Sequence, residues 1–201
     1  MIIRKTRVWY EHAKYHVMAR GVSGASLYKN EEDYEVFFMI LRKTKEKYPF
    51  ILHSYCLMTT HFHMLITTMT DEIWKVMKYL MYNYAMYFNR RYGRRGHVFD
   101  ARYVSCLIED GGYFLEVSRY IHLNPVRAGM VREPLAYKHS SYGCFFMEEE
   151  SELLDCREVL GYFRGNQEEQ YRMFVEGAVS HAEQEMVIEK NMGEDERWLP
   201  W

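Results

Sequence analysis

The spacing of hydrophobic residues switches along the chain between the short period of a strand and the longer period of a helix. Short apolar or alternating runs predict strands at residues 14–20, 50–59, 61–68 and 101–110. Longer segments with apolar residues three and four positions apart predict helices at residues 30–49, 71–93 and 111–124. The elements therefore follow one another in the order β-α-β-β-α-β-α.

This order predicts an α+β fold. Its first six elements match the split βαβ, ferredoxin-like pattern, in which one four-stranded antiparallel sheet carries two helices on one face. The third helix is a further element beyond that pattern. Because many functions share this fold, function has to be argued from particular residues.

Several residues mark where these elements begin and end. Asn30 is a suitable N-cap for the first helix, and Gly93 follows the second. Pro125 is expected to end the third helix, because a proline disfavours helical geometry at the residue before it. The turn between the second and third strands falls near Thr59 and Thr60, which are weak turn formers, so the sequence determines that boundary only loosely.

Two histidines stand one residue apart in the strand that begins "HFHMLITT". Alternate residues of a strand point to the same face, so His61 and His63 project together while Phe62 and Met64 point the other way. Two neutral imidazoles on a rigid strand can hold one divalent metal ion. Alternatively, they are ordinary polar residues on an exposed sheet face. A metal site would also need a third ligand from elsewhere.

The third helix supplies candidates for that ligand and for a nucleophile. Tyr120 and Asn124 are four residues apart and share a helical face. An asparagine oxygen suits Mg²⁺ or Mn²⁺, and a tyrosine hydroxyl can attack a phosphate that a metal polarises. Tyr113 lies seven residues before Tyr120 on nearly the same face, so spacing alone accepts either tyrosine. Asn124 alternatively caps the helix end.

Charge is distributed unevenly along the chain. Residues 1–147 hold 21 Lys and Arg against 13 Asp and Glu, a net +8, whereas residues 148–201 hold 5 against 15, a net −10. A basic body suggests contact with a polyanion such as DNA, although a solvated surface with an acidic end gives the same count. We therefore divide the chain into a domain at 1–147 and an acidic, partly helical extension at 148–201. For the extension there are four alternatives: it packs on the body, it trails in solvent, it covers the basic surface, or it recruits a partner.

The segment "NRRYGRRGH" concentrates positive charge at the end of the second helix. Four arginines surrounding a tyrosine are what phosphate contacts with a stacking ring require: Arg90, Arg91, Tyr92, Arg94 and Arg95. The alternative is a basic helix end that interacts favourably with the helix dipole. Weaker DNA-binding candidates are Arg20, Arg102 and Arg127.

Cysteine usage and hydropathy bear on the compartment. The four cysteines form no CxxC pair, which argues against a thiolate zinc site or a disulfide framework. No apolar stretch is long enough to span a bilayer, and the N-terminus lacks the apolar core of a secretory signal. We expect a cytoplasmic protein with no membrane partner.

Taken together, "YHVMARG", "HSYCLMTTHFHMLI", "FNRRYGRRGHVFDARY", "RYIHLNPVRAG" and "HSSY" resemble the single-tyrosine HUH transposases, and most closely the REP-associated tyrosine transposases. The resemblance covers roughly residues 8–145, and several ordered motifs are more specific than any one of them. It implies that His61 and His63 bind a divalent metal ion, that Tyr120 is the nucleophile and that Asn124 is the third ligand. The resemblance thus selects Tyr120 over Tyr113.

The activity implied by the resemblance is cleavage and rejoining of single-stranded, hairpin-containing DNA through a 5′-phosphotyrosine link, with Mg²⁺ or Mn²⁺ as cofactor. The protein is expected to act as a monomer or a homodimer. Val22 and Thr60 depart from the family pattern, where asparagine is usual. Val22 and the acidic extension motivate a second hypothesis, a non-catalytic regulator that binds hairpin DNA. A metal phosphohydrolase acting on small substrates is a third, which lacks a carboxylate-rich motif near the histidines.

Overall fold

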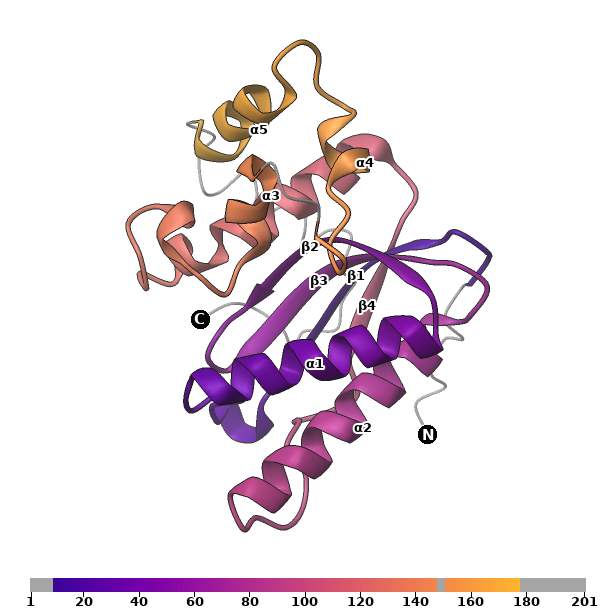
Figure 1. Ribbon diagram of the computed structural model, residues 1–201, viewed down its shortest axis with the longest axis vertical. Coiled ribbons are helices and arrows are strands. Elements are labelled where there is room, and N and C mark those ends of the chain that lie inside the picture. Colours follow the sequence, from indigo (N-terminus) through magenta and orange to yellow (C-terminus); the bar gives the residue numbers. More distant parts are fainter. Residues whose placement is uncertain (1–8, 148–150, 178–201) are drawn as a thin grey trace, which may run out of the picture.

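The computed structural model describes residues 9–147 and 151–177, and its centre is an antiparallel sheet with the strand order β2-β3-β1-β4. The strands are β1 (Lys14–Arg20), β2 (Phe50–Leu57), β3 (His61–Thr68) and β4 (Val104–Ile108). Figure 1 shows two helices on one face of the sheet, α1 (Glu31–Lys47) and α2 (Ile73–Arg91). A third helix, α3 (Gly111–Arg127), lies on the other face.

The predicted fold class is confirmed. β1 lies between β3 and β4, and every pairing in the sheet is antiparallel, as the ferredoxin-like pattern requires. The fourth strand is shorter than the run 101–110 that the sequence indicated. Before β4, the chain runs beside the end of β1 outside the regular strand pairing. There the amide of Asp100 donates to the carbonyl of Arg20 over 3.0 Å.

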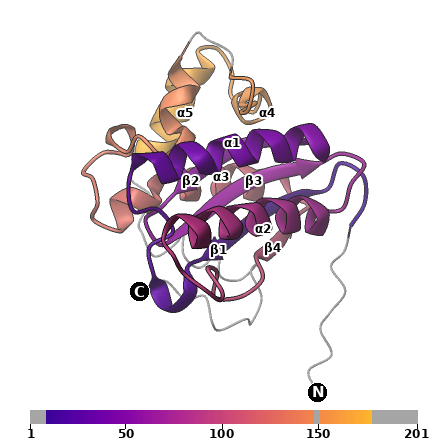
Figure 2. The same cartoon turned by 60° about the horizontal axis from the view of Figure 1, so that its bottom comes forward.

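Figure 2 shows α1 and α2 as one layer against the sheet. Part of the hydrophobic core lies between that layer and the sheet. The ring of Phe37 on α1 lies 5.3 Å from that of Phe62 on β3 and 5.2 Å from that of Tyr84 on α2, measured between centroids. All three side chains are fully buried. Since Phe62 points into this core, alternation turns His61 and His63 towards the opposite face.

Helix ends follow the local chemistry of the sequence. The side chain of Asn30 accepts a hydrogen bond from the amide of Asp33 over 3.2 Å, so Asn30 caps α1 as predicted. Gly93 adopts a φ of 60° just past the end of α2. That left-handed conformation favours glycine and stops the helix.

The prediction that Pro125 ends the third helix is wrong, because α3 continues to Arg127. A proline in a helix removes the hydrogen bond from its own nitrogen to the carbonyl four residues before it. The last turn is closed by other groups, since the amide of Ala128 donates to the carbonyl of Asn124 over 2.9 Å. A single missing bond next to the helix end is therefore tolerated.

The chain after α3 packs on the same side of the sheet as α3. This part of the chain contains the 3-10 helices η2 (Pro134–Ala136) and η3 (Ser141–Phe146) and then the α-helices α4 (Arg157–Leu160) and α5 (Gln167–Glu176). Another 3-10 helix, η1 (Val22–Gly24), follows β1. Tyr171 of α5 stacks on Phe145 of η3 with 4.5 Å between ring centroids. The amide of Asp155 donates to the carbonyl of Leu52 on β2 over 2.8 Å. Residues 151–177 thus pack on the body.

The remaining residues of the acidic extension, 148–150 and 178–201, lie outside the described part of the chain. The division of the chain at residues 147 and 148 stays a prediction. In the described ranges, no helix combines the length and the apolar character needed to cross a membrane.

Candidate functional site

His61 and His63 project from β3 towards α3. Their ring centroids are 5.0 Å apart and the ring planes are nearly perpendicular, at 87°. β3 is an interior strand, hydrogen-bonded to β2 on one side and β1 on the other. The backbone that carries both histidines is therefore held on both edges, which gives the rings a rigid base.

Each histidine is oriented by a hydrogen bond at Nδ1. The hydroxyl of Thr60 lies 3.0 Å from Nδ1 of His61, and Nε2 of His16 lies 3.0 Å from Nδ1 of His63. Among the described residues, Nε2 of His61 and Nε2 of His63 make no hydrogen bond. The ring nitrogens left available on β3 are thus the two Nε2 atoms.

Burial keeps these imidazoles neutral. It lowers the pKa of His16 to about 4. Burial, together with the positive charge of Arg20, also lowers the pKa of His61 to about 4. The pKa of His63 lies well below its ordinary value because of burial and, next, the neighbouring His61 and His16. Neutral imidazole is the form that binds a metal ion.

Tyr120 of α3 lies against this group of histidines. Its ring centroid is 5.6 Å from that of His63 and 5.9 Å from that of His16, with the rings packed edge to face. Tyr113, the other candidate, is buried earlier in α3, and no ring contact joins it to a histidine within the described chain. Burial also raises the pKa of Tyr113. The fold therefore brings Tyr120 to the histidines and leaves Tyr113 away from them.

Asn124 follows Tyr120 by one turn of α3 and is almost fully buried, at 9% exposed. Its Nδ2 donates to the backbone carbonyl of Tyr120 over 2.8 Å. This bond fixes the orientation of the amide and uses its nitrogen. The bond does not use Oδ1, which is the type of hard oxygen that a divalent cation prefers. No hydrogen bond joins Asn124 to either histidine of β3 among the described residues.

Arg127 extends the same face of α3 and contacts the tyrosine. Its guanidinium carbon lies 5.0 Å from the centroid of the Tyr120 ring. The sequence pattern suggested Arg127 only as a weak DNA-binding residue. A cation over the face of a phenol also fixes the ring and favours negative charge on its oxygen.

A divalent metal ion fits the chemistry of these side chains. Within the described ranges, no group of three or more His, Cys, Asp or Glu is placed to hold a metal ion. A metal here would rest on two imidazoles and the oxygen of Asn124, with water or phosphate completing its coordination. The engagement of both Nδ1 atoms supports this fit, because histidines that bind metal through Nε2 usually donate their other nitrogen to a neighbour.

The basic segment at the end of α2 divides into two groups. Arg91 and Tyr92 are held by the start of α1: Arg91 pairs with Glu32, and the hydroxyl of Tyr92 donates to Asp33 over 2.7 Å. The ammonium of Lys29 covers the Tyr92 ring at 4.1 Å from its centroid. These two residues therefore already have partners within the protein.

The other arginines of the prediction differ in exposure. Arg90, Arg95 and Arg102 are exposed, whereas Arg94 lies over the ring of Phe88 at 5.6 Å from its centroid. Arg20 pairs with Asp100 over 3.0 Å, directly beside His61 in the pairing of β1 with β3. Positive charge thus lies both at the end of α2 and next to the histidines.

A buried chain of hydrogen bonds holds the far side of α3. The hydroxyl of Tyr171 on α5 lies 2.7 Å from Ser118 Oγ and 2.7 Å from Nδ1 of His122. His122 Nε2 in turn lies 2.7 Å from Ser141 Oγ, and Ser118 Oγ lies 2.7 Å from Ser54 Oγ on β2. His122 is therefore a structural neighbour of α5 and faces away from Tyr120. The chain of bonds fixes the rotation of the helix that presents Tyr120.

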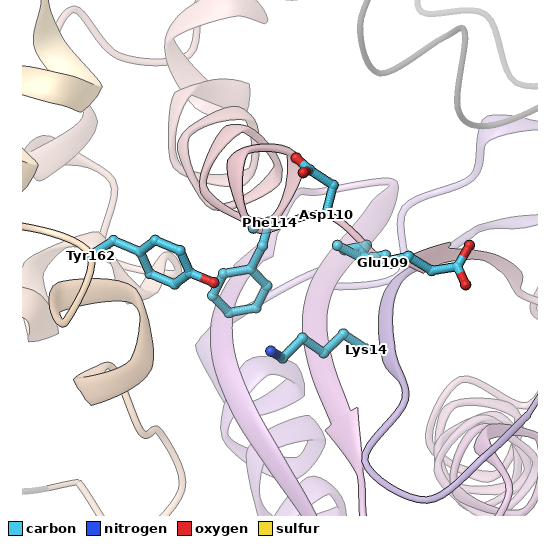
Figure 3. A pocket seen from close by; sticks show the side chains of 7 residues that line it. Lys14, Glu109, Asp110, Phe114 and Tyr162 are labelled. Atoms are coloured by element: carbon cyan, nitrogen blue, oxygen red, sulfur yellow. The ribbon is translucent and has the colours of Figure 1, made fainter.

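A small pocket of about 120 Å³ lies at the first turn of α3 and shares no residue with the histidine site. Figure 3 shows its lining, with Lys14 below the ring of Phe114 and the phenol of Tyr162 reaching in from one side. Lys14 pairs with Glu158, and Asp110 caps α3 by accepting from the amide of Tyr113 over 2.8 Å. Lys14 and Asp110, two of the three charged residues of this lining, are thus engaged within the protein.

Sequence reasoning missed two residues of this site, His16 and Thr60. The sequence analysis named Thr60 as a turn residue and as a departure from a family pattern, and it included His16 only as one residue of the first strand. The available signal was a histidine flanked by apolar residues in that strand, "YHV". It does not show that β1 pairs with β3, and that pairing is what joins His16 to His63.

Comparisons with known proteins bear on the family and the fold of the chain. A family described as "Transposase IS200 like" matches residues 10–124. Among solved structures, the chain is similar to a REP-associated tyrosine transposase bound to a REP hairpin, with a TM-score of 0.64 and 14% identity over 77% of this chain and 94% of that one. A transposase candidate from Deinococcus radiodurans gives a TM-score of 0.42 and 17% identity over 59% and 95% of the two chains. No match was found among curated proteins.

Proposed function

Because the family match covers more than half of its length, the chain belongs to the IS200-like transposases, and we propose that it cleaves and rejoins single-stranded DNA through a 5′-phosphotyrosine intermediate in a metal-dependent reaction. The observation that carries this proposal is the contact between Tyr120 and His63, with 5.6 Å between ring centroids. It sets a phenol of α3 beside a histidine of β3 whose Nε2 is available.

In the proposed reaction the hydroxyl oxygen of Tyr120 attacks a phosphodiester of the DNA. A bond forms between that oxygen and phosphorus while the bond from phosphorus to the neighbouring 3′ oxygen breaks. The phenol loses a proton and the departing 3′ oxygen gains one, so the 5′ end stays on the protein and a free 3′-hydroxyl is released. The number of phosphoester bonds is unchanged, so rejoining needs no ATP.

The residues around Tyr120 have distinct tasks in this proposal. Arg127 orients the phenol and favours the charge that develops on its oxygen. A Mg²⁺ or Mn²⁺ ion held by His61, His63 and Asn124 would withdraw charge from the phosphate and set it in line for attack. Burial keeps the two imidazoles neutral and able to bind such an ion.

We propose hairpin-containing single-stranded DNA as the substrate. A protein of the same fold is bound to a REP hairpin, and this chain exposes Arg90 and Arg95 at the end of α2. Exposed arginines neutralise phosphates and release counterions, which makes the binding of nucleic acid dependent on salt. We propose that the protein acts as a monomer or a homodimer. Size-exclusion chromatography with and without DNA measures which of the two forms is present.

The test is adduct formation on denaturing gels. Purified protein is incubated with a labelled library of single-stranded hairpins and with Mn²⁺ or Mg²⁺. Wild type and Tyr113→Phe are expected to form a covalent protein–DNA adduct, whereas Tyr120→Phe and His61→Ala are expected to form none. Tyr113→Phe is the matched control, because it removes a hydroxyl from a tyrosine of the same helix whose ring does not contact the histidines of the described chain.

An adduct that persists in Tyr120→Phe would refute the choice of nucleophile. Hairpin binding by wild type without any adduct, with either metal ion, would instead favour the second candidate, a regulator that binds DNA without cutting it. Hydrolysis of a generic phosphodiester in the absence of DNA would favour a small-substrate phosphohydrolase.

A further inference from the structure

His16 is a fully buried histidine of β1 that has no role in the proposed reaction as described above. Its side chain is 0% exposed, and its single hydrogen bond among the described residues joins its Nε2 to Nδ1 of His63 over 3.0 Å. The two rings also stack, with centroids 5.2 Å apart and planes 26° apart. His16 thus meets the site through its hydrogen bond to His63 and through the packing of its ring against Tyr120, with 5.9 Å between centroids.

Packing alone does not account for a histidine at this position. Nδ1 of His16 is buried and has no hydrogen-bond partner in the described part of the chain. A leucine would fill a similar volume without burying a nitrogen that lacks a partner. The polar atom that does have a partner, Nε2, points at His63, so the chemistry of His16 is directed at that residue.

The direction of this hydrogen bond decides whether His63 can bind a cation. One proton lies between the two nitrogens, and either ring can donate it. If His16 donates, the Nδ1 of His63 is an acceptor, and a neutral His63 then carries its own proton on Nε2. If His63 donates from Nδ1, its Nε2 keeps a lone pair, and Nε2 is the ring nitrogen of His63 that makes no hydrogen bond among the described residues.

We infer that His16 is a positioning residue that accepts a hydrogen bond from Nδ1 of His63 and thereby holds the Nε2 lone pair of His63 towards a bound divalent cation. This inference rests on the proposed function, because it needs His63 to be a metal ligand. Thr60 meets Nδ1 of His61 over 3.0 Å in the same manner. The two histidines are thus oriented by different partners, a hydroxyl on one and a second imidazole on the other.

The first experiment measures Mn²⁺ binding to the full chain without DNA by isothermal titration calorimetry. His16→Leu is expected to lower the affinity for Mn²⁺ roughly 10- to 100-fold, the usual effect of removing a partner that orients a metal ligand. His16→Gln, whose amide oxygen can accept the same bond, is expected to recover most of that loss. The matched control is His53→Leu, since His53 is also a buried sheet histidine but bonds to Thr67, away from the site.

Urea unfolding of the metal-free variants separates positioning from folding. If His16 serves the metal site, His16→Leu keeps or gains stability while it loses Mn²⁺ affinity. A parallel loss of both, with no recovery in His16→Gln, would overturn the inference in favour of a structural role.

A second measurement uses the wild type and so does not depend on a variant folding. With ¹⁵N-labelled histidine and saturating Mg²⁺, long-range ¹⁵N–¹H spectra are expected to show the His63 proton on Nδ1 and no proton on Nε2 of His16. A His63 proton on Nε2 in the Mg²⁺-bound protein would overturn the inference.

His61→Ala distinguishes failure of this inference from failure of the proposed site. If His61→Ala abolishes Mn²⁺ binding while His16→Leu binds as wild type does, the role of His16 alone is wrong. If His61→Ala binds Mn²⁺ as wild type does, both the metal site and the role of His16 are wrong.

Discussion

The guanidinium of Arg127 lies over the ring of Tyr120, with 5.0 Å between its carbon and the ring centroid. The two residues are seven positions apart on α3, two helical turns, so they share a face of the helix. Their contact therefore survives any rigid movement of α3 relative to the sheet, and Arg127 accompanies the tyrosine wherever the helix goes.

We expect Arg127→Met to slow adduct formation about tenfold at saturating DNA, because a cation over a phenol contributes about 1–2 kcal/mol where it is shielded from water. The measurement is the single-turnover rate of adduct formation, with hairpin affinity determined separately. Arg132→Met, which alters an exposed arginine just beyond α3, serves as control. An unchanged rate combined with weaker hairpin binding would make Arg127 a phosphate contact only.

Two arginines at the end of α2 are expected to behave differently although they are close in sequence. Arg95 and Arg91 are both exposed, but Arg91 pairs with Glu32 and lies 3.6 Å from the buried Asp33. Arg95→Gln should reduce the slope of log K against log salt for hairpin binding by about 1, since one phosphate contact is lost. Arg91→Gln should leave that slope unchanged and lower the urea midpoint of unfolding. The reverse pattern would show that Arg91 leaves Glu32 to bind DNA.

Tyr171→Phe tests the buried hydrogen bonds behind α3. Removing its hydroxyl leaves Ser118 and Nδ1 of His122 short of a partner in a fully buried place, which costs about 1–3 kcal/mol of unfolding free energy. Urea unfolding followed by circular dichroism measures the change. Tyr82→Phe removes a hydroxyl from an exposed ring and should have no effect. Equal stability of the Tyr171 variant and wild type would show that water replaces the missing group.

Acid should destabilise the fold through its buried histidines. Burial lowers the pKa of His122 to about 3, whereas an imidazole in the unfolded chain titrates near pH ~6.5. Between these values the unfolded chain binds a proton that the folded protein does not, so stability falls as the pH drops below about 6.5. His122 alone contributes a slope of about 1.4 kcal/mol per pH unit in that window.

His122→Asn should therefore flatten the dependence of unfolding free energy on pH between pH ~6 and pH ~4 by that one-proton slope. The amide can still meet the hydroxyl of Tyr171, which limits the loss of stability at neutral pH. Urea unfolding at several pH values measures both slopes. An identical slope in variant and wild type would contradict a neutral, buried His122.

The local pattern of the sequence determined much of this protein. Strand periodicity was enough to put His61 and His63 on one face and Phe62 on the other, because side-chain direction in a strand depends only on parity. The alternating order of strands and helices was enough to predict the antiparallel sheet, and Asn30 and Gly93 marked helix ends through their own backbone chemistry. These features depend on residues that are close in the chain.

The tertiary structure decided which distant side chains meet. Tyr113 and Tyr120 lie on nearly one helical face, so only the docking of α3 on the sheet brings Tyr120 to the histidines. His16 reaches His63 across 47 residues through the pairing of β1 with β3. Arg91 and Tyr92 are predicted DNA contacts from the sequence, and only packing shows that α1 and its buried Asp33 also lie against them. Periodicity gives a side chain's direction but not the position of its element along a neighbour, and only packing supplies that position.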